Sequence, residues 1–272
     1  MYSLLAKAVK SYLSETVVVN GKDVILPWGY RLATGGRLPT DTWMFNTRML
    51  SALLETASGA FLDVGFHLGQ TLVAVKADQT YYGFEPSPEC HWFVNELIRA
   101  NGYSKCTLVP AGLWDENDLL TLWARAPHDI CASVVPGFRD DRSYVPAATV
   151  PVYKGDYLVR KLDIGPVGVL KIDVEGAELE VIRGLSDTLS AFRPYILCEI
   201  LPIYDPNAER GRFVEQRQRA LEAILKDHGY EIHRILPSGE LVRVDLIEVH
   251  SDLSLSDYLL MPIEKRIGSL PS

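Results

Sequence analysis

An α/β fold with a mostly parallel sheet is the fold class that the sequence predicts, and three observations lead to it. From residue 60 onward, short apolar runs typical of buried strands alternate with longer segments of helical periodicity. Segments that alternate in this way form β-α-β units with right-handed crossovers, so helices are expected on both faces of the sheet. Three of the apolar runs end in an acidic residue, at Asp63, Glu85 and Asp173. The carboxyl ends of parallel strands are where such folds bind ligands.

Residues 1–57 are expected to form an N-terminal extension in front of this domain. Apolar side chains recur at helical spacing in 1–14, which favours a helix packed on its own domain over one that binds a partner or a membrane surface. Two valine-rich runs flank Asn20-Gly21 and predict a β-hairpin. A helix is expected to follow over 41–56, with a polar residue at its start.

Residues 58–272 form the predicted main domain. Its strands are expected near 60–64, 80–84, 106–110, 167–172, 195–200, 229–235 and 257–261, and its helices near 70–77, 88–101, 176–191 and 208–228. Residues 113–166 interrupt the alternation, because loop signals at several prolines follow a single strand-like run at 119–123. Long irregular inserts in compact domains are commonly functional, so this one is a candidate region for binding a substrate.

The composition is that of an ordinary globular protein and excludes several classes of protein. The chain has 272 residues, 47% of them hydrophobic, with a formal net charge of −8. Nucleic acid is not expected as a partner, because the sequence contains no run rich in lysine and arginine. No apolar run has the ~20 residues that a membrane span needs. The four cysteines form no C-x-x-C pair, which indicates free thiols and a cytoplasmic location.

The segment Phe61–Thr71 is the most informative motif. A buried strand ends at Asp63, and Gly65 and Gly69 allow a tight turn close to a ligand. A dinucleotide site would need G-x-G-x-x-G to hold a pyrophosphate, whereas a carboxylate occupies the first of these positions here and repels phosphate. Glu85, at the end of the next strand, is placed to accept hydrogen bonds from ribose hydroxyls. A ribose and a cationic amino-acid end without phosphates describe S-adenosylmethionine (SAM). An ordinary strand-turn-helix with incidental glycines is the alternative.

A second acidic group follows the strand that ends at Asp173. Glu175 comes two residues later, and Glu178 falls in the first turn of the next expected helix. Carboxylates at this edge can deprotonate a hydroxyl, bind a divalent metal or hold a polar substrate. Glu175 and Glu178 can also simply complement the helix dipole. Three histidines are rival bases, His67 in the first loop, His91 after Glu85, and His128 in the insert.

On these motifs the sequence resembles the FkbM family of SAM-dependent methyltransferases over residues 58–201. The matching segments are Phe61–Gly65, Gly69–Thr71, Gly83–Pro88, Asn101-Gly102, Leu170–Glu178, Val181–Gly184 and Pro194–Ile200. The resemblance implies a class I methyltransferase (Rossmann-like) fold, with seven strands that are mostly parallel. It also places the last two strands, near 229–235 and 257–261, as the reversed pair. One departure lies in the first loop, where the family commonly has Ala-Asn and this chain has Phe66-His67.

The resemblance also implies two groups of site residues. The cofactor group follows the first three strands, with Asp63, Gly65 and Gly69 around the methionine part, Glu85 on the ribose and Pro86, Ser87, Ala111 and Gly112 near the adenine. His67, Gln70 and Thr71, in the same loop, complete this group. The acceptor group comprises Lys171, Asp173 and Glu175, with His128 as a further candidate catalytic residue, and a magnesium site at Asp173, Glu175 and Glu178 is left open.

The function expected from the sequence is therefore O-methylation of a hydroxyl on a sugar, a glycan or a polyketide-like natural product. Asp173 or Glu175 would act as the base or as the residue that orients the hydroxyl through a metal. The partner is then a small molecule or glycan, and a homo-oligomer is compatible with the N-terminal helix. A methyltransferase-like subunit that only binds a partner is one alternative. An NAD-dependent dehydrogenase is the other, opposed by the absent glycine fingerprint.

Overall fold

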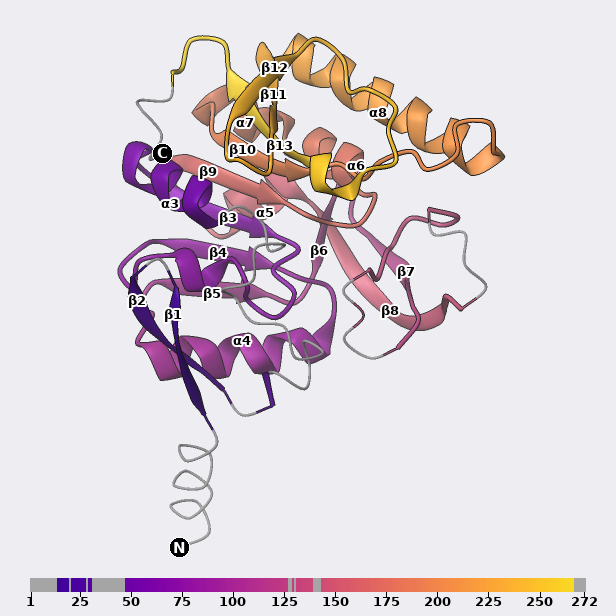
Figure 1. Cartoon of the computed structure of the whole chain (residues 1–272). Helices are drawn as coiled ribbons and strands as arrows, with labels where there is room; N and C mark the ends of the chain where they lie inside the picture. The colour runs from indigo at the N-terminus through magenta and orange to yellow at the C-terminus, as the bar shows by residue number, and fades with distance from the viewer. Residues whose placement is uncertain are drawn as a thin grey trace, which may run out of the picture.

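A central sheet organises the chain, whose computed structural model describes residues 14–19, 21–27, 29–30, 47–126, 129, 131–138 and 143–266. Within these residues the sheet has eight strands. From one edge to the other they are β12 (Leu241–Val244), β11 (Tyr230–Ile235), β13 (Asp257–Pro262), β10 (Tyr195–Glu199), β9 (Val167–Ile172), β3 (Ala60–Val64), β4 (Tyr81–Phe84) and β5 (Cys106–Val109). Figure 1 shows helices on both sides of this sheet. The α/β class and all seven expected strands are confirmed.

The direction of the last strands differs from the prediction. Strands β5, β4, β3, β9 and β10 form parallel pairs, and β13 is antiparallel to both of its neighbours, β10 and β11. Strand β11 therefore runs in the same direction as β10, and the expectation that 229–235 and 257–261 are both reversed is wrong. A long helix connects β10 to β11 and returns the chain to the same end of the sheet, which makes these strands parallel. The additional strand β12 pairs with β11 as a hairpin at the edge.

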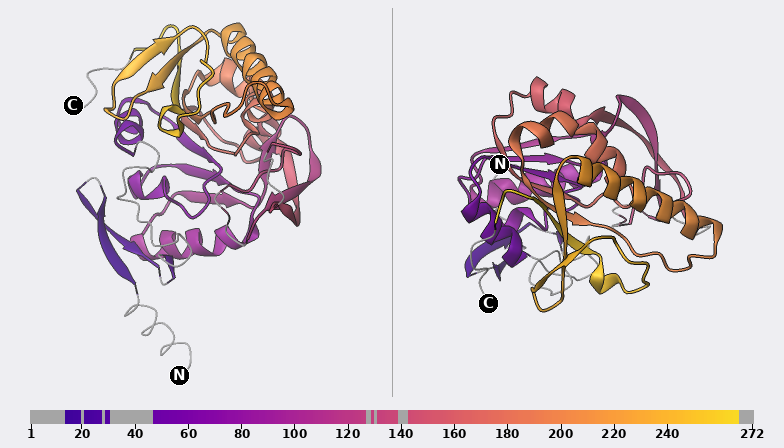
Figure 2. Two further views of the ribbon diagram at one scale, coloured as in Figure 1. Left: turned by 45° about the vertical axis from the view of Figure 1, so that its right-hand side comes forward. Right: turned by 90° about the horizontal axis from the view of Figure 1, so that it is seen from above.

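The two faces of the sheet bury two separate apolar cores. Alternate residues of one strand point to opposite faces, so Leu62 and Leu170 belong to one core and Phe61 and Val169 to the other. The first core is covered by α5 (Gly155–Lys161), α6 (Glu178–Gly184), α7 (Ser186–Phe192) and α8 (Glu209–Asp227). The second is covered by α3 (Thr47–Thr56), the 3-10 turn η1 (Leu72–Ala74) and α4 (Pro88–Asn101). Figure 2 shows α8 along its length in the right-hand view. The result is a three-layer arrangement.

Two of the four expected helices of the main domain are confirmed, since α4 and α8 lie where the periodicity placed them. The helix expected over 176–191 is divided into α6 and α7 at Leu185. The helix expected over 70–77 is wrong, because only η1 forms there and the backbone is extended again at Val75. The Thr71 hydroxyl donates a hydrogen bond to the buried Asp63 carboxylate instead of capping a helix.

The front of the chain forms the expected hairpin, from β1 (Glu15–Val19) and β2 (Lys22–Leu26). The hairpin is attached to the end of α4, because the Asn101 side chain accepts a hydrogen bond from the Ile25 amide at 2.7 Å and donates one to its carbonyl at 2.8 Å. Figure 1 shows the hairpin beside α4. The helix expected over 1–14 and the start of the one expected over 41–56 lie outside the described residues. The boundary at residue 57 stays a prediction.

Residues 113–166 are more regular than predicted. In the described part of this segment, three strands form a second sheet in the order β6-β8-β7, from β6 (Gly112–Trp114), β7 (Asp118–Ala124) and β8 (Val145–Lys154). The prolines in this segment indicated loops, yet Pro146 and Pro151 lie within β8. They are tolerated because β6 pairs only with Val152–Lys154, which leaves both prolines in the part of β8 that has one neighbouring strand.

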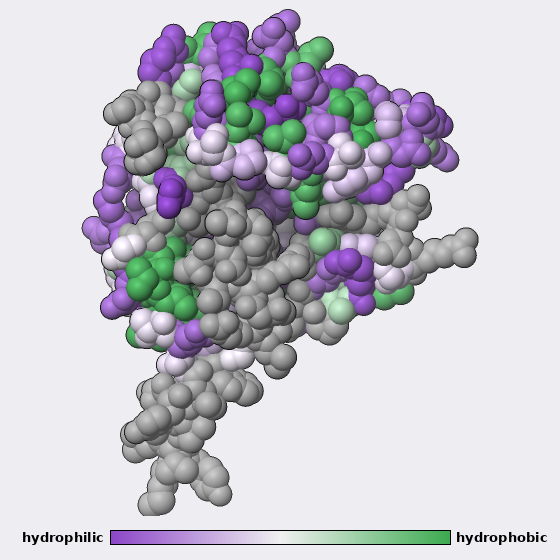
Figure 3. All heavy atoms as spheres, viewed as in Figure 1, coloured by the Kyte–Doolittle hydropathy of each residue, from purple (hydrophilic) through white to green (hydrophobic). Residues whose placement is uncertain are grey.

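The described surface indicates no particular partner. Figure 3 shows mainly polar side chains over the end of the molecule that carries α8 and β12, with apolar ones set among them. The exposed apolar residues there include Val242, Leu246 and Val249. Single exposed apolar side chains are normal for a protein surface. No helix among the described residues is long and apolar enough to cross a membrane. The four cysteines are free thiols, and self-association stays a prediction.

Candidate active site

The loop after β3 lies at the carboxyl end of the sheet and is held by the neighbouring strand. Gly65 has a φ of +80° and Gly69 a φ of +81°, in the left-handed region that favours glycine. The Gly65 amide donates to the Phe84 carbonyl at 2.8 Å, which fastens the start of the loop to the end of β4. His67 also has a positive φ, of 45°, so the residues that replace the family's usual Ala-Asn adopt a tightly wound backbone.

Asp63 is fully buried beneath this loop, and its contacts are with the protein itself. One carboxylate oxygen accepts hydrogen bonds from the Thr71 hydroxyl and from the Tyr81 hydroxyl, the latter at 2.9 Å. The other oxygen accepts no hydrogen bond from the described residues and lies 3.4 Å from the Lys171 Nζ. The hydrogen bond between Asp63 and Thr71 therefore holds the two ends of the loop together inside the protein.

Glu85 connects the loop to the end of β4. One of its oxygens accepts a hydrogen bond from the His67 amide at 3.1 Å, and the other accepts one from the Ser87 amide at 2.9 Å. Burial raises the pKa of Glu85 to about 7, against these hydrogen bonds, which lower it. Each oxygen keeps a second lone pair, so the carboxylate can also accept hydrogen bonds from a ligand hydroxyl.

The other predicted cofactor residues surround this carboxylate. Gln70 interacts with the His67 ring at 3.0 Å and accepts a hydrogen bond from the Leu68 amide. Gly112 lies beside Pro86, since a Cβ added to the glycine would be 3.8 Å from that ring. Ala111, just before Gly112, is buried. The structure thus brings the ends of β3, β4 and β5 together at one edge, as the parallel order requires.

His91 has a local structural role. Its Nε2 lies 2.8 Å from the Glu85 carbonyl oxygen, and its ring packs edge-on against Phe66 with 5.0 Å between centroids. These contacts support the loop from the side of α4. His128, the other rival base outside the loop, lies outside the described residues.

Lys171 lies between the loop after β3 and the carboxylates after β9. Its Nζ is 3.4 Å from the Asp63 carboxylate and 3.3 Å from that of Asp173, and it donates to the Gly65 carbonyl at 2.6 Å. Burial disfavours the charge, but the two carboxylates outweigh it and raise the pKa of Lys171. The side chain is buried, so it links the two loops rather than facing an open acceptor pocket as predicted.

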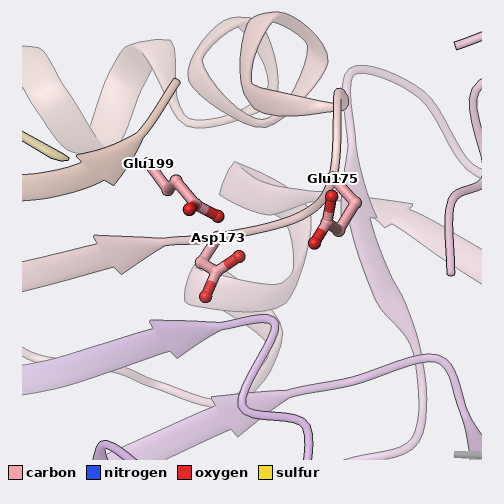
Figure 4. Close-up of side chains that lie close together, drawn as sticks. All are labelled: Asp173, Glu175 and Glu199. Atoms are coloured by element: carbon pink, nitrogen blue, oxygen red, sulfur yellow. The ribbon is translucent and has the colours of Figure 1, made fainter. Parts of the chain in front are cut away.

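Three carboxylates meet where β9 and β10 end. Figure 4 shows Asp173, Glu175 and Glu199 pointing toward one another, with one oxygen of each within 4.8 Å of the others. Burial, followed by the Asp173 and Asp257 charges, raises the pKa of Glu199 well above its ordinary value. The Lys171 ammonium beside Asp173 offsets part of this negative charge, and a proton on Glu199 or a bound cation would offset more of it.

Glu199 was missed and Glu178 was misplaced in the predicted metal group. Glu178 is not part of the carboxylate group found among the described residues. Its carboxylate accepts a hydrogen bond from the Gly176 amide at 2.9 Å, and burial raises its pKa to about 7. The sequence held a signal for Glu199, because this residue also ends an apolar strand. Neighbouring parallel strands place such residues side by side.

Replacing Gly65 by alanine is expected to destabilise the fold by at least about 2 kcal/mol and to abolish ligand binding at this loop. The added Cβ would lie 1.8 Å from the Asp173 carbonyl oxygen, in a backbone that has a positive φ. Urea unfolding measures the loss. Gly102→Ala is the matched control, because Gly102 has a φ of +69° with nothing within 4 Å of the added atom. Equal losses in the two variants would contradict the close contact between the loops.

Residues 63–232 match the family model described as Methyltransferase FkbM domain. The chain is also 26% identical over 162 residues to the hexuronic acid methyltransferase AglP of Haloferax volcanii. This alignment covers 58% of the chain and spans 63% of the length of that relative.

Two solved structures are among those with a similar arrangement of elements. The methyltransferase FkbM from Methylobacillus flagellatus is 17% identical with a TM-score of 0.44, and the match covers 75% of this chain and 43% of that one. The O-methyltransferase from Bacillus cereus is 10% identical with a TM-score of 0.45, over 95% of this chain and 88% of that one.

Proposed function

The chain belongs to the FkbM methyltransferase domain family, and from this premise we propose that it transfers the methyl group of SAM to a hydroxyl of a sugar or glycan. One observation carries the proposal. The loop after β3 and the carboxylates after β9 lie against each other at the carboxyl end of the sheet, where Gly65 adjoins Asp173. A cofactor on the first loop would therefore present its methyl group beside a cluster of bases.

The charge of the site supports SAM as the methyl donor. Asp63 and Asp173 flank one buried lysine, and Glu175 and Glu199 lie beside Asp173. Carboxylates therefore outnumber the lysine, and the site favours a cationic ligand over a pyrophosphate. SAM carries a sulfonium and an ammonium group and no phosphate. Glu85 would accept hydrogen bonds from its ribose hydroxyls. Binding of SAM but not NAD in calorimetry is the expected result, and the opposite result would favour a dehydrogenase.

The acceptor class follows from the chemistry of the carboxylates and from the relative that is named for a hexuronic acid. The acceptor oxygen would bond to the methyl carbon while its proton passes to Asp173 or Glu175. The carbon–sulfur bond breaks at the same time, and its electron pair stays on the sulfur. Burial, followed by the Asp173 and Asp257 charges, raises the pKa of the neighbouring Glu199, which supports uptake of a proton by this cluster.

The proposal also includes a divalent metal ion bound at the carboxylates. Oxygens from Asp173, Glu175 and Glu199 form the donor set that Mg²⁺ prefers, and the ion would supply the compensation that three adjacent carboxylates need. A proton on Glu199, whose pKa burial raises well above its ordinary value, supplies it otherwise. The four free cysteines suit a reducing compartment, and a cytoplasmic location stays a prediction.

Transfer of labelled methyl groups from SAM tests both parts. We expect transfer to a glucuronic acid glycoside, with the matched glucose glycoside showing whether the acceptor carboxylate matters. If the metal is required, EDTA lowers the rate at least about 100-fold and added Mg²⁺ restores it. If the enzyme stays fully active in EDTA, no metal ion is required, and a proton compensates the charge of the three carboxylates instead. Failure to bind SAM at millimolar concentration would instead favour a binding subunit without catalysis.

A further inference from the structure

The backbone that carries Glu175 is strained. Glu175 has a φ of 53° and Gly176 a φ of 107°, and a residue other than glycine in the left-handed region costs about 1–2 kcal/mol. Such strain persists only when the surroundings hold it in place. Both carbonyls of this short stretch are bound by donors that are distant in the sequence.

Ser133 holds the first carbonyl. It is buried, and its hydroxyl donates a hydrogen bond to the Glu175 carbonyl at 2.7 Å. Ser133 is itself fixed to the end of β7, because it exchanges backbone hydrogen bonds with Trp123 at 2.9 and 3.0 Å. The hydroxyl also accepts a hydrogen bond from the Val135 amide at 3.1 Å. The second sheet thus reaches the carboxylate loop through one side chain.

Gly176 is held from the opposite side. Arg217 of α8 donates to the Gly176 carbonyl at 2.8 Å, while its guanidinium forms an ion pair with Glu180. The Phe138 ring covers Gly176, since a Cβ there would lie 2.5 Å from it. The amide of Gly176 donates to Glu178, as described above. With Ser133 these groups fix the orientation of the peptide that directs Glu175 toward Asp173 and Glu199.

We propose that Ser133 is a positioning residue for methyl transfer, which holds the Glu175 carboxylate in the site and couples that carboxylate to the second sheet. The inference rests on the proposed function. The strain on Glu175 would be relieved by releasing its carbonyl, and the carboxylate would then turn away from Asp173. A displacement of about 1 Å in a reacting group can cost 100-fold in rate.

The test compares Ser133→Ala with wild type in labelled methyl transfer and in hydrogen exchange of the ligand-free protein. We expect kcat to fall about 10- to 100-fold, while KM for SAM and its calorimetric Kd stay unchanged. Exchange should rise most at residues 174–177, and the free energy of unfolding should fall by no more than about 1–3 kcal/mol, which is what an unpaired buried hydrogen-bonding group costs. Ser133→Thr, which keeps the hydroxyl on an extended backbone, should recover most of the rate. Ser190→Ala is the control, because that serine lies on α7 and bonds His228 at the end of α8, away from the site.

The outcomes separate this inference from the proposed function. If wild type binds no SAM but Ser133→Ala still raises exchange at 174–177, the proposed function alone fails. If exchange and kcat in Ser133→Ala equal those of wild type, the positioning role is wrong. A general loss of stability, with kcat and SAM affinity falling together, would also overturn it, because that pattern belongs to a residue that only supports the fold.

Discussion

Replacing Lys171 by methionine is expected to destabilise the protein by about 3–5 kcal/mol, as removal of one partner from a buried ion pair commonly does. Methionine fills a similar volume but leaves the Asp63 and Asp173 carboxylates without their shared cation. It also removes the hydrogen bond to the Gly65 carbonyl that fastens the cofactor loop. SAM binding should therefore be lost under conditions in which the variant stays folded. Urea unfolding and calorimetry measure the two effects.

Two controls show that the effect of Lys171→Met comes from buried charge. Lys76→Met removes an ion pair with Glu55 whose side chains are 57% and 63% exposed, and should change stability by less than about 1 kcal/mol. Adding Asp63→Asn to Lys171→Met removes one uncompensated charge and should recover part of the loss. A double variant less stable than Lys171→Met alone would show that packing, and not charge, dominates at this position.

The fold was accessible from the sequence because its central strands are buried on both faces. Continuous apolar runs such as 195–198 have few alternatives to a parallel strand. The second sheet was not predicted, since β8 contains Pro146 and Pro151 and its tolerance of them depends on which neighbours pair with it. That information lies in the tertiary arrangement. The direction of β11 likewise depended on the order of strands in space.

The candidate site was predicted in outline and not in its contacts. Residues at strand ends could be assigned to one edge, because parallel order alone brings Asp63, Glu85 and Asp173 together. The partners of each side chain could not be read from the sequence. Lys171 points between two loops, and Ser133 reaches Glu175 across 42 residues. Such contacts depend on the packing of the second sheet against the first.

Replacing Asp173 by asparagine is expected to lower the rate of methyl transfer by about 100- to 10,000-fold, the usual effect of losing a general base. Asparagine keeps the size of the side chain, but it cannot accept the proton of an acceptor hydroxyl or serve as an anionic metal ligand. SAM affinity should change far less than kcat, because Asp173 lies on the acceptor side of the cofactor loop. Single-turnover transfer from labelled SAM separates the chemical step from binding.

Asp115→Asn is the matched control, because both aspartate side chains are 32% exposed and both lie within 4 Å of a cation. The cation is Arg183 for Asp115 and Lys171 for Asp173.

The pH dependence of the reaction gives a second test of Asp173. The Asp173 charge raises the pKa of Glu199, second to burial, so Asp173→Asn should also lower the pKa of Glu199 toward its ordinary value. The acidic limb of the pH–rate profile should then move to lower pH in any residual activity. A full rate in Asp173→Asn would exclude Asp173 as the base and leave Glu175, whose carbonyl accepts the hydrogen bond from Ser133. A low rate with an unchanged profile would instead assign Asp173 to orienting the acceptor, since the loss of its charge would have had no effect on the neighbouring carboxyl.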